Sequence, residues 1–366
     1  MMEDIQSIKS WDVIRDVPFA IAGPCSAETE EQLYTTCKGI KEHDITMLRA
    51  GIWKPRTRPG SFEGVGEVGL QWMEKVKTEL NMPAAVEVAN AKHVELALKY
   101  NMDVLWIGAR STVNPFTVQE IADALQGVNI PIIIKNPINP DLALWKGAIE
   151  RIYMAGIRQI AALHRGFSSF EKTKYRNVPM WQIAIALKSD MPNLPLLCDP
   201  SHIGGTRDLI LPISQKAIDL NYDGLMIETH CDPDNAWSDA KQQVTPERLG
   251  EILDSIKIRK TTSDNQEFNS ILETMRSQID HVDREILENM AARKVLVDKL
   301  GEYKKENNVT VFQSDRWLQV FKTRADWGTQ LNLDTEFVGK LFKLIHDESI
   351  RLQSKVMNDK KEKISK

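Results

Sequence analysis

The sequence predicts a (β/α)8 barrel over residues 1–258, a short linker over residues 259–267 and a separate all-helical domain over residues 268–366. Two observations favour the barrel. Eight short apolar runs recur between Phe19 and His230, and helix-spaced apolar residues occupy the segments between them. A third observation favours the helical domain, because strand-like runs stop in the last part of the chain and apolar residues there recur every three or four positions.

The apolar runs are bounded by Gly, Pro, Asn or Asp, and several are rich in Val and Ile. Continuous apolar strands suit a parallel sheet that is covered by helices. A doubly wound open sheet is the structural alternative, but such a sheet usually has fewer strands, and no GxGxxG turn follows the first run. The expected strands are 19–26, 46–52, 84–89, 104–110, 131–136, 158–165, 195–200 and 224–230.

Residues 259–266, with the sequence RKTTSDNQ, are polar and contain no residue that would build a core, as expected of a linker. From Phe268 onward the apolar spacing persists for about ten turns, which predicts one long helix. Two shorter helices are expected at 314–325 and 334–356. One chain of this domain cannot bury so long an apolar stripe, so we expect a homodimer through the helical domain.

The composition is typical of a soluble globular protein, since 42% of the 366 residues are hydrophobic, 27% are charged and the net charge is −4. These values exclude a disordered chain, and the lack of a basic excess argues against nucleic acid or a membrane surface as a partner. No apolar run is long enough to span a bilayer, and the N-terminus does not read as a signal peptide. The four irregularly spaced cysteines indicate reduced thiols, so we expect a cytoplasmic protein.

Cationic residues stand at or just after the ends of the expected strands, where barrels of this kind carry their active sites. Six positive charges at one barrel mouth would repel one another unless anions filled the space between them. Arginine and lysine suit phosphate and carboxylate oxygens, so we infer substrates with at least two phosphates, or with a phosphate and a carboxylate. Pairing with local acids such as Glu63 and Glu87 is the alternative for any single cation. The six are Arg49, Lys54, Arg56, Arg110, Lys135 and Arg165.

A second group of strand-end residues offers a thiol, an imidazole and two carboxylates, in Cys25, His202, Glu228 and Asp239. This mixture of soft and hard donors suits one divalent first-row ion, Mn, Fe, Co or Zn, better than Mg or Ca. The spacing alone is a weak signal, because neither CxxC nor HExxH is present. For Cys25 the alternative is a small buried hydrophobe.

Seven motifs within about residues 18–257 resemble those of 3-deoxy-D-arabino-heptulosonate 7-phosphate (DAHP) synthase, and the set most resembles its short microbial form. They are GPCSAE (23–28), LRAGIWKPRT (48–57), IGAR (107–110), IIKN (133–136), LHRG (163–166), DPSHIGG (199–205) and the ETH…SDAKQQ stretch (228–243). This family joins phosphoenolpyruvate to erythrose 4-phosphate and releases phosphate. The resemblance implies that Cys25, His202, Glu228 and Asp239 bind the metal ion, which polarises the aldehyde as a Lewis acid.

The resemblance also assigns the cations to the two substrates. It implies that the sugar phosphate meets Arg56 and Thr57, and we further hypothesise that Lys54 is catalytic, managing the proton on the aldehyde oxygen or on the attacking water. A related family, 3-deoxy-octulosonate 8-phosphate synthase, uses a five-carbon sugar and typically has a KANRSS-like stretch. The KPRT sequence at 54–57 favours the four-carbon sugar instead. The residues implied to hold phosphoenolpyruvate are Arg49, Lys54, Arg110, Lys135 and Arg165.

Residues 275–304 and 342–353 resemble the all-helical, type II chorismate mutase family, and the likeness covers about residues 268–356. Chorismate and prephenate are dicarboxylates, and their interconversion needs cations near the carboxylates and the breaking C–O bond rather than a nucleophile or a metal. The resemblance implies catalytic roles for Arg293, Lys304 and Gln353. The positions implied to bind chorismate or prephenate are Arg276, Arg293, Lys304, Gln313, Arg316, Ser349 and Gln353.

Arg276 precedes Arg293 by seventeen residues, which places it about 100° away around a helix and outside the pocket of its own chain. In the resembling family this arginine reaches into the partner's site, which gives the expected dimer a functional reason. The family often has acidic residues where this chain has Gln313 and Trp317. The alternative is therefore a non-catalytic module that senses chorismate or prephenate, dimerises and restrains the barrel.

Overall fold

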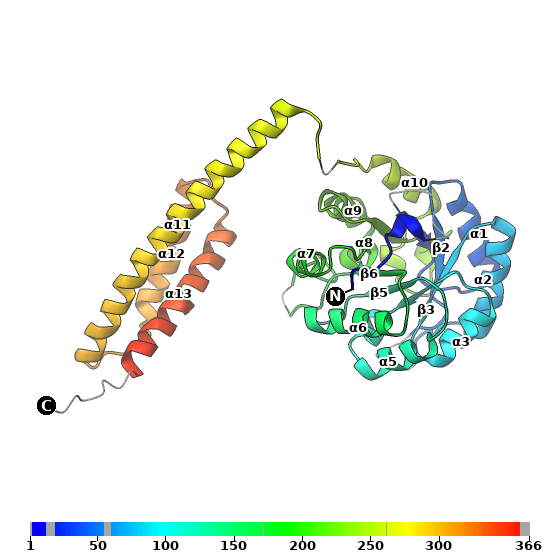
Figure 1. The fold of residues 1–366 in the computed structure, drawn as a ribbon, viewed down its shortest axis with the longest axis horizontal. Helices are drawn as coiled ribbons and strands as arrows, with labels where there is room; N and C mark the ends of the chain where they lie inside the picture. The colour runs from blue at the N-terminus through cyan, green and yellow to red at the C-terminus, as the bar shows by residue number, and fades with distance from the viewer. Residues whose placement is uncertain (1, 12–18, 55–59, 171, 261, 359–366) are drawn as a thin grey trace. The chain divides into compact units, whose positions relative to one another are not determined.

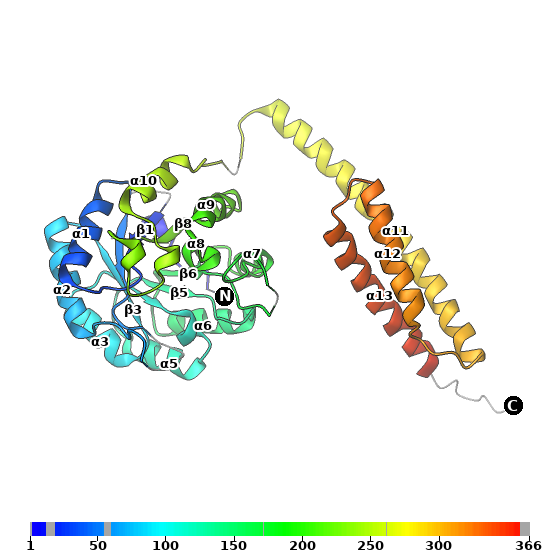
Figure 2. The same cartoon turned by 180° about the vertical axis from the view of Figure 1, so that it is seen from behind.

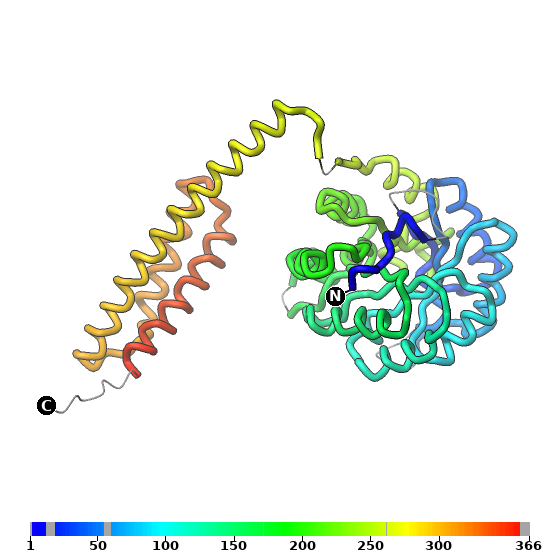
Figure 3. Tube along the Cα trace, in the orientation of Figure 1, coloured from blue at the N-terminus to red at the C-terminus, as the bar shows by residue number. Residues whose placement is uncertain are grey.

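The computed structural model describes residues 2–11, 19–54, 60–170, 172–260 and 262–358. The chain divides into two compact units, Met1–Thr261 and Thr262–Lys366, and each unit is described by itself. The first unit is a barrel of strands surrounded by helices, and the second is a bundle of long helices (Figure 1). The path of the chain through each unit can be followed in Figure 3.

Eight parallel strands form a closed barrel in sequence order, with β1 hydrogen-bonded to both β2 and β8. This topology confirms the predicted fold class. Every strand lies inside its predicted run and ends before that run does. The last residues of each run therefore follow the strand, at the mouth of the barrel where the carboxyl ends of the strands meet. The strands are β1 (Phe19–Gly23), β2 (Met47–Ala50), β3 (Ala84–Val88), β4 (Val104–Ile107), β5 (Ile132–Lys135), β6 (Ile160–His164), β7 (Leu196–Cys198) and β8 (Gly224–Glu228).

Helices cover the outside of the barrel, as the view from behind also shows (Figure 2). Several begin at a capping side chain: Thr29, Asn90 and Asp141 each accept a hydrogen bond from the backbone N–H three residues on. The helices of this unit are α1 (Glu30–Lys41), α2 (Glu67–Leu80), α3 (Ala91–Lys99), α4 (Ala109–Thr112), α5 (Pro115–Ala124), α6 (Leu142–Met154), α7 (Trp181–Asp190), α8 (Pro200–Gly204), α9 (Ile210–Asp219) and α10 (Pro246–Ser255).

The alternation of side chains along the strands separates an outer core, which faces the helices, from an inner core on the barrel axis. The inner core contains Trp106 together with apolar residues from the other strands, and Trp11 joins it from the N-terminal segment. Near the mouth the inner positions become charged, which creates a site directly above the core. On β2, β5 and β8 the change comes two residues after an apolar one: Arg49 after Met47, Lys135 after Ile133 and Glu228 after Met226.

The second unit consists of α11 (Gln266–Glu306), α12 (Ser314–Gln330) and α13 (Thr335–Asn358), in which both α11 and α12 pack against α13. Only Val297, Gly301 and Lys304 of α11 are buried, so the contact with the rest of the unit is confined to the second half of that helix. Gly301 allows this close approach, because a Cβ atom there would lie 3.3 Å from the Cα of Gln353. Most apolar residues of the first half of α11 are exposed, among them Phe268, Met275 and Ile279, whereas Leu272 is half-buried.

Several helix ends differ from the expected ones, and α13 runs to Asn358 rather than to 356. The long helix begins at Gln266, inside the segment expected to be linker, because Asn265 caps it by accepting a hydrogen bond from the backbone N–H of Phe268. Helix α12 continues to Gln330 rather than stopping near 325. Its Gly328 serves packing and not helix termination, since a Cβ atom there would lie 2.7 Å from Val338 Cγ2. None of the helices in the described ranges is both long and apolar enough to cross a membrane.

Candidate functional sites

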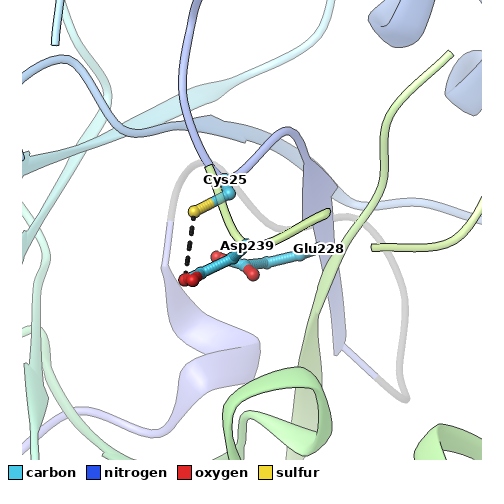
Figure 4. Close-up of side chains that lie close together, drawn as sticks. All are labelled: Cys25, Glu228 and Asp239. Atoms are coloured by element: carbon cyan, nitrogen blue, oxygen red, sulfur yellow. Dashed lines mark hydrogen bonds between the residues drawn. The ribbon is translucent and has the colours of Figure 1, made fainter. Parts of the chain in front are cut away.

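Three of the four predicted metal ligands form a cluster at the barrel mouth (Figure 4). Cys25 follows β1, Glu228 ends β8 and Asp239 lies in the loop after β8, and their ligand atoms lie within 4.8 Å of one another. The fourth, His202, projects from α8 with its Nε2 atom 3.8 Å from Glu228 Oε1 and 3.9 Å from Asp239 Oδ2. The structure therefore brings the whole predicted set to one place.

Asp199 holds His202 in this orientation. It caps α8 by accepting a hydrogen bond from the backbone N–H of His202, and its Oδ2 atom lies 2.8 Å from His202 Nδ1. Lys135 Nζ also lies 3.0 Å from Asp199 Oδ2. Burial opposes ionisation of Asp199, but His202 and Lys135 hold the pKa of this carboxyl well below its usual value. Because Nδ1 of His202 faces a carboxylate, Nε2 is left to face the cluster.

The thiol of Cys25 is fully buried beside Lys54, whose Nζ lies 3.0 Å from Cys25 Sγ. Burial and the nearby charge of Glu228 raise the pKa of Cys25 to about 12, although Lys54 pulls it down. A bound cation reverses this balance, since a metal ligand must be a thiolate. The donor set of sulfur, imidazole and carboxylates therefore fits a borderline divalent ion.

Arg49 lies beside the cluster of candidate metal ligands and also forms, with Lys135, a cationic floor over the ring of Trp106. Its side chain is 1% exposed, with Nη1 3.2 Å from Glu228 Oε1 and Nη2 donating to the carbonyl of Cys25 at 3.1 Å. Arg49 and Lys135 both lie over the ring of Trp106, at 4.8 and 5.8 Å from its centroid. The Nε atom of Arg49 is buried and has no hydrogen-bond partner among the described residues.

The remaining predicted cations lie in the loops after the strands. Arg165 follows β6, and its Nη1 donates to Asn177 Oδ1 at 2.6 Å, while burial lowers its pKa to about 10. Arg110 lies in α4, directly after β4. Arg56 and Thr57, the predicted sugar-phosphate contacts, lie outside the described residues.

Arg176 and Asn177, which the sequence analysis did not single out, contact the candidate metal ligands. Arg176 Nη1 lies 3.0 Å from Asp239 Oδ1, and Asn177 Nδ2 donates to the carbonyl of His202 at 2.6 Å. Gln242 adds a hydrogen bond from its Nε2 to Glu228 Oε2 at 2.6 Å. Arg176 and Asn177 lie in the long loop between β6 and α7, so an inspection restricted to strand ends does not find them. The one sequence feature that marks them is an arginine next to an asparagine within that loop.

In the helical unit, several of the predicted residues meet between α11 and α13. Arg293 Nη1 donates to Ser349 Oγ at 2.8 Å, and Gln353 Nε2 donates to the carbonyl of Ser349 at 3.2 Å. Lys304 is buried, and its Nζ donates to the carbonyl of Val311 at 2.7 Å. Burial lowers the pKa of Arg293 and that of Lys304.

Three predicted residues of this unit are exposed. Arg316 donates from Nη1 to Gln319 Oε1 at 2.6 Å, and Gln313 precedes α12 without making a side-chain cap. Arg276 donates from Nη1 to Glu273 Oε1 at 2.6 Å, on the same helix. Arg276 is thus engaged with its own helix, on the half of α11 that has no packing partner in the described chain.

Comparison with known families agrees with both units. Residues 14–264 match the model of the DAHP synthetase I family, and residues 275–354 match that of chorismate mutase type II. The phospho-2-dehydro-3-deoxyheptonate aldolase of Thermotoga maritima is 33% identical over 237 residues, which cover 65% of this chain and 68% of that protein. A 2-dehydro-3-deoxyphosphooctonate aldolase of Legionella pneumophila is 29% identical over 259 residues, which cover 65% of this chain and 90% of that protein.

Solved structures give the same relationship. The crystal structure of the DAHP synthase of Thermotoga maritima matches with a TM-score of 0.59 and 31% identity, covering 64% of this chain and 67% of that one. A truncated form of the synthase from the same organism matches with a TM-score of 0.57 and 27% identity, covering 72% of this chain and 93% of that one. The chain therefore belongs to the DAHP synthetase I family, and a type II chorismate mutase domain follows its barrel.

Proposed function

We propose that the barrel condenses phosphoenolpyruvate with erythrose 4-phosphate to form DAHP and phosphate, the first step of the shikimate pathway. We propose further that the helical domain rearranges chorismate to prephenate. The position of Arg49 carries the first proposal. One guanidinium contacts both Glu228 and the backbone of Cys25 while lying over Trp106, so the cationic floor and the cluster of candidate ligands form one site.

One divalent first-row ion, Mn, Fe, Co or Zn, is proposed to be held by Cys25, His202, Glu228 and Asp239. Two carboxylates and a thiol this close together are favoured when a positive ion lies between them, which supports the assignment. When bound, the ion supplies a Lewis acid for the aldehyde carbonyl. Removal of metal with a chelator should abolish DAHP formation, and adding back each ion separately should identify the one that restores the highest rate.

The side chains around the ion site then have distinct tasks. Arg49, Lys135 and Arg165 neutralise the phosphate and carboxylate of phosphoenolpyruvate and fix its orientation over Trp106. Arg110 adds a fourth cation from α4. Lys54 is proposed to hold or deliver a proton at the aldehyde oxygen or at the water that adds to carbon 2, and the position of its Nζ beside Cys25 Sγ supports this role.

The four-carbon sugar is preferred over the five-carbon sugar of 3-deoxy-octulosonate 8-phosphate synthase, because residues 54–57 read KPRT. The test compares kcat/KM for erythrose 4-phosphate and arabinose 5-phosphate at saturating phosphoenolpyruvate. We expect erythrose 4-phosphate to be favoured by about a hundredfold or more. The extra CHOH unit of the longer sugar shifts its phosphate away from the cations when its aldehyde is in place, which leaves polar groups of the site unpaired. A preference for arabinose 5-phosphate would contradict the DAHP synthase assignment and favour 3-deoxy-octulosonate 8-phosphate synthase instead.

The mutase proposal is supported by cations that lie on apolar helices. Arg293 beside Ser349 binds a carboxylate of chorismate, whereas Lys304 and Gln353 interact with the ether oxygen as the C–O bond breaks. Chorismate disappearance on the full-length chain, measured with a chelator present, tests this directly. Turnover that survives metal removal supports a second, metal-free active site. Binding of prephenate without turnover would favour the alternative of a ligand-sensing module.

We also propose a homodimer through α11, which would bring Arg276 to the partner's mutase site, and feedback control of the barrel by chorismate or prephenate. The exposed apolar residues on the first half of α11 support the dimer. Deletion of residues 261–366 tests the feedback. If the synthase rate and its response to prephenate stayed unchanged, the coupling would be absent. Cytoplasmic location is proposed because the four cysteines are free thiols.

A further inference from the structure

Helix α13 carries one more polar side chain in line with the proposed mutase residues. His346, Ser349 and Gln353 are separated by three and four residues, so they share one face of the helix. Ser349 and Gln353 have roles in the proposed function, but His346 has none. The charges of both Arg293 and Lys304 act on His346, so its ring lies near these two cations.

The Nε2 atom of His346 is buried and has no hydrogen-bond partner among the described residues. In the described part of the helical unit, three buried side-chain polar atoms share this condition: Arg324 Nε, His346 Nε2 and Gln353 Oε1. Arg324 belongs to the same region, because its charge acts on that of Arg293. Buried polar atoms are rarely left unpaired, so their gathering beside Arg293 indicates a place built for a polar ligand.

Aromatic neighbours fix the plane of the imidazole. The ring of His346 is stacked on Trp317, with centroids 4.0 Å apart and an interplanar angle of 27°, and Phe312 meets it edge-on at 6.1 Å. Burial, together with the charges of Arg293 and Lys304, lowers the pKa of His346, and the nearby Asp347 opposes this only in part. The lowered pKa favours the neutral imidazole, and a neutral ring nitrogen pairs with an uncharged hydroxyl.

We propose that His346 Nε2 forms the hydrogen bond to the ring hydroxyl of chorismate, an inference that rests on the proposed mutase function. Chorismate offers two carboxylates, an ether oxygen and one hydroxyl. The arginines match the carboxylates, and Lys304 and Gln353 match the ether oxygen, which leaves the hydroxyl for Gln313 or His346. The Gln313 side chain is exposed, whereas His346 Nε2 is buried without a partner among the described residues. Trp317 stands where the family often has an acid, and it cannot accept a hydrogen bond from that hydroxyl. The ring stacked on Trp317 supplies the polar atom instead.

The test combines a side-chain change with a substrate change. His346→Phe keeps a ring that can stack on Trp317 but removes both nitrogens, whereas His346→Gln retains a polar atom near the position of Nε2. Each full-length variant is assayed with chorismate and with 4-deoxychorismate, which lacks the hydroxyl. We expect His346→Phe to lose about ten- to a hundredfold in kcat/KM with chorismate, and less than about threefold with the deoxy analogue. His346→Gln should recover part of the loss.

His281→Phe is the matched control, because His281 is exposed and lies on the side of α11 opposite the apolar stripe. It should leave both rates unchanged. An equal loss with both substrates in His346→Phe would mean that the ring only packs, and the proposal would be wrong. Unchanged turnover of chorismate would also overturn it. If the unaltered protein turned over no chorismate, the mutase function itself would fail, and calorimetry with prephenate, which also carries a hydroxyl, would test the hydrogen bond. Weaker binding by His346→Phe than by the unaltered chain would support it, and equal binding would overturn it.

Discussion

Arg165 and Asn177 are joined by a 2.6 Å hydrogen bond from Nη1 to Oδ1, and the same Asn177 side chain donates through Nδ2 to the carbonyl of His202. One amide thus connects a cation proposed to bind phosphoenolpyruvate with a residue proposed to bind the metal ion. Because an amide offers a donor on one side and an acceptor on the other, no single charged group could make both contacts.

Replacement of Asn177 by alanine tests this connection. Asn177→Ala removes both hydrogen bonds at once, so we expect the KM for phosphoenolpyruvate to rise about tenfold while kcat changes less. Metal affinity, measured by calorimetry without substrate, should fall as well, because the backbone of His202 loses its anchor. Asn193→Ala, on the exposed surface, is the control. A rise in KM without any change in metal affinity would show that Asn177 serves Arg165 alone.

Lys54 should affect turnover more than binding. We expect Lys54→Ala to lower kcat for DAHP formation by about a hundredfold or more, because proton transfer by a positioned group contributes at least that factor. Steady-state kinetics with both substrates varied will separate kcat from KM. A variant that lost affinity for phosphoenolpyruvate but kept its turnover rate would contradict the catalytic role and leave Lys54 as a binding residue.

Metal binding should depend on pH through Cys25. Burial raises the pKa of this thiol to about 12 in the metal-free protein, so at neutral pH it must lose a proton when the ion binds. Rising pH therefore favours binding, and the metal affinity should increase about tenfold per pH unit for the single proton released. Calorimetry in buffers of different ionisation enthalpy will count that proton. Cys231→Ser should leave the count unchanged, and a count of zero would exclude Cys25 as a ligand.

The apolar stripe on α11 should control assembly. Ile279 is 58% exposed and lies on this stripe, so Ile279→Asp should convert the expected dimer to a monomer. His281→Asp introduces a like charge on the opposite side of the helix and should leave the mass unchanged. Light scattering coupled to gel filtration will measure the molecular mass of both variants. If Ile279→Asp kept the mass of the unaltered protein, α11 would not be the interface.

The strand ends could be predicted because a barrel imposes a simple rule on its sequence. Inner positions such as Met47 stay apolar until the strand reaches the mouth, where Arg49 replaces them, so a change of residue type marks the site. The fold class followed from the eight apolar runs, and the convergence of Cys25 with Glu228 followed from their positions at strand ends. The roles of these residues in binding remain predictions.

Asn177 and Arg176 could not be found in the same way. Both lie in an irregular loop, where neither the strand period nor the helix period ties a residue to a place in space. Helix α12 also runs past its expected end near 325. Glycine has a low intrinsic preference for helix, but at Gly328 the close packing of Val338 outweighs that preference. Tertiary contacts of this kind are absent from the local sequence.

Helix α11 is 41 residues long, yet only its second half is packed within the unit. If a second copy covers the first half, the helical order around Arg276 depends on protein concentration by mass action. Dilution would then lower the specific activity of the mutase while the barrel, closed within one chain, keeps its own. The amount of enzyme that a cell makes would thus set not only the flux but also the ratio between the two activities of one polypeptide.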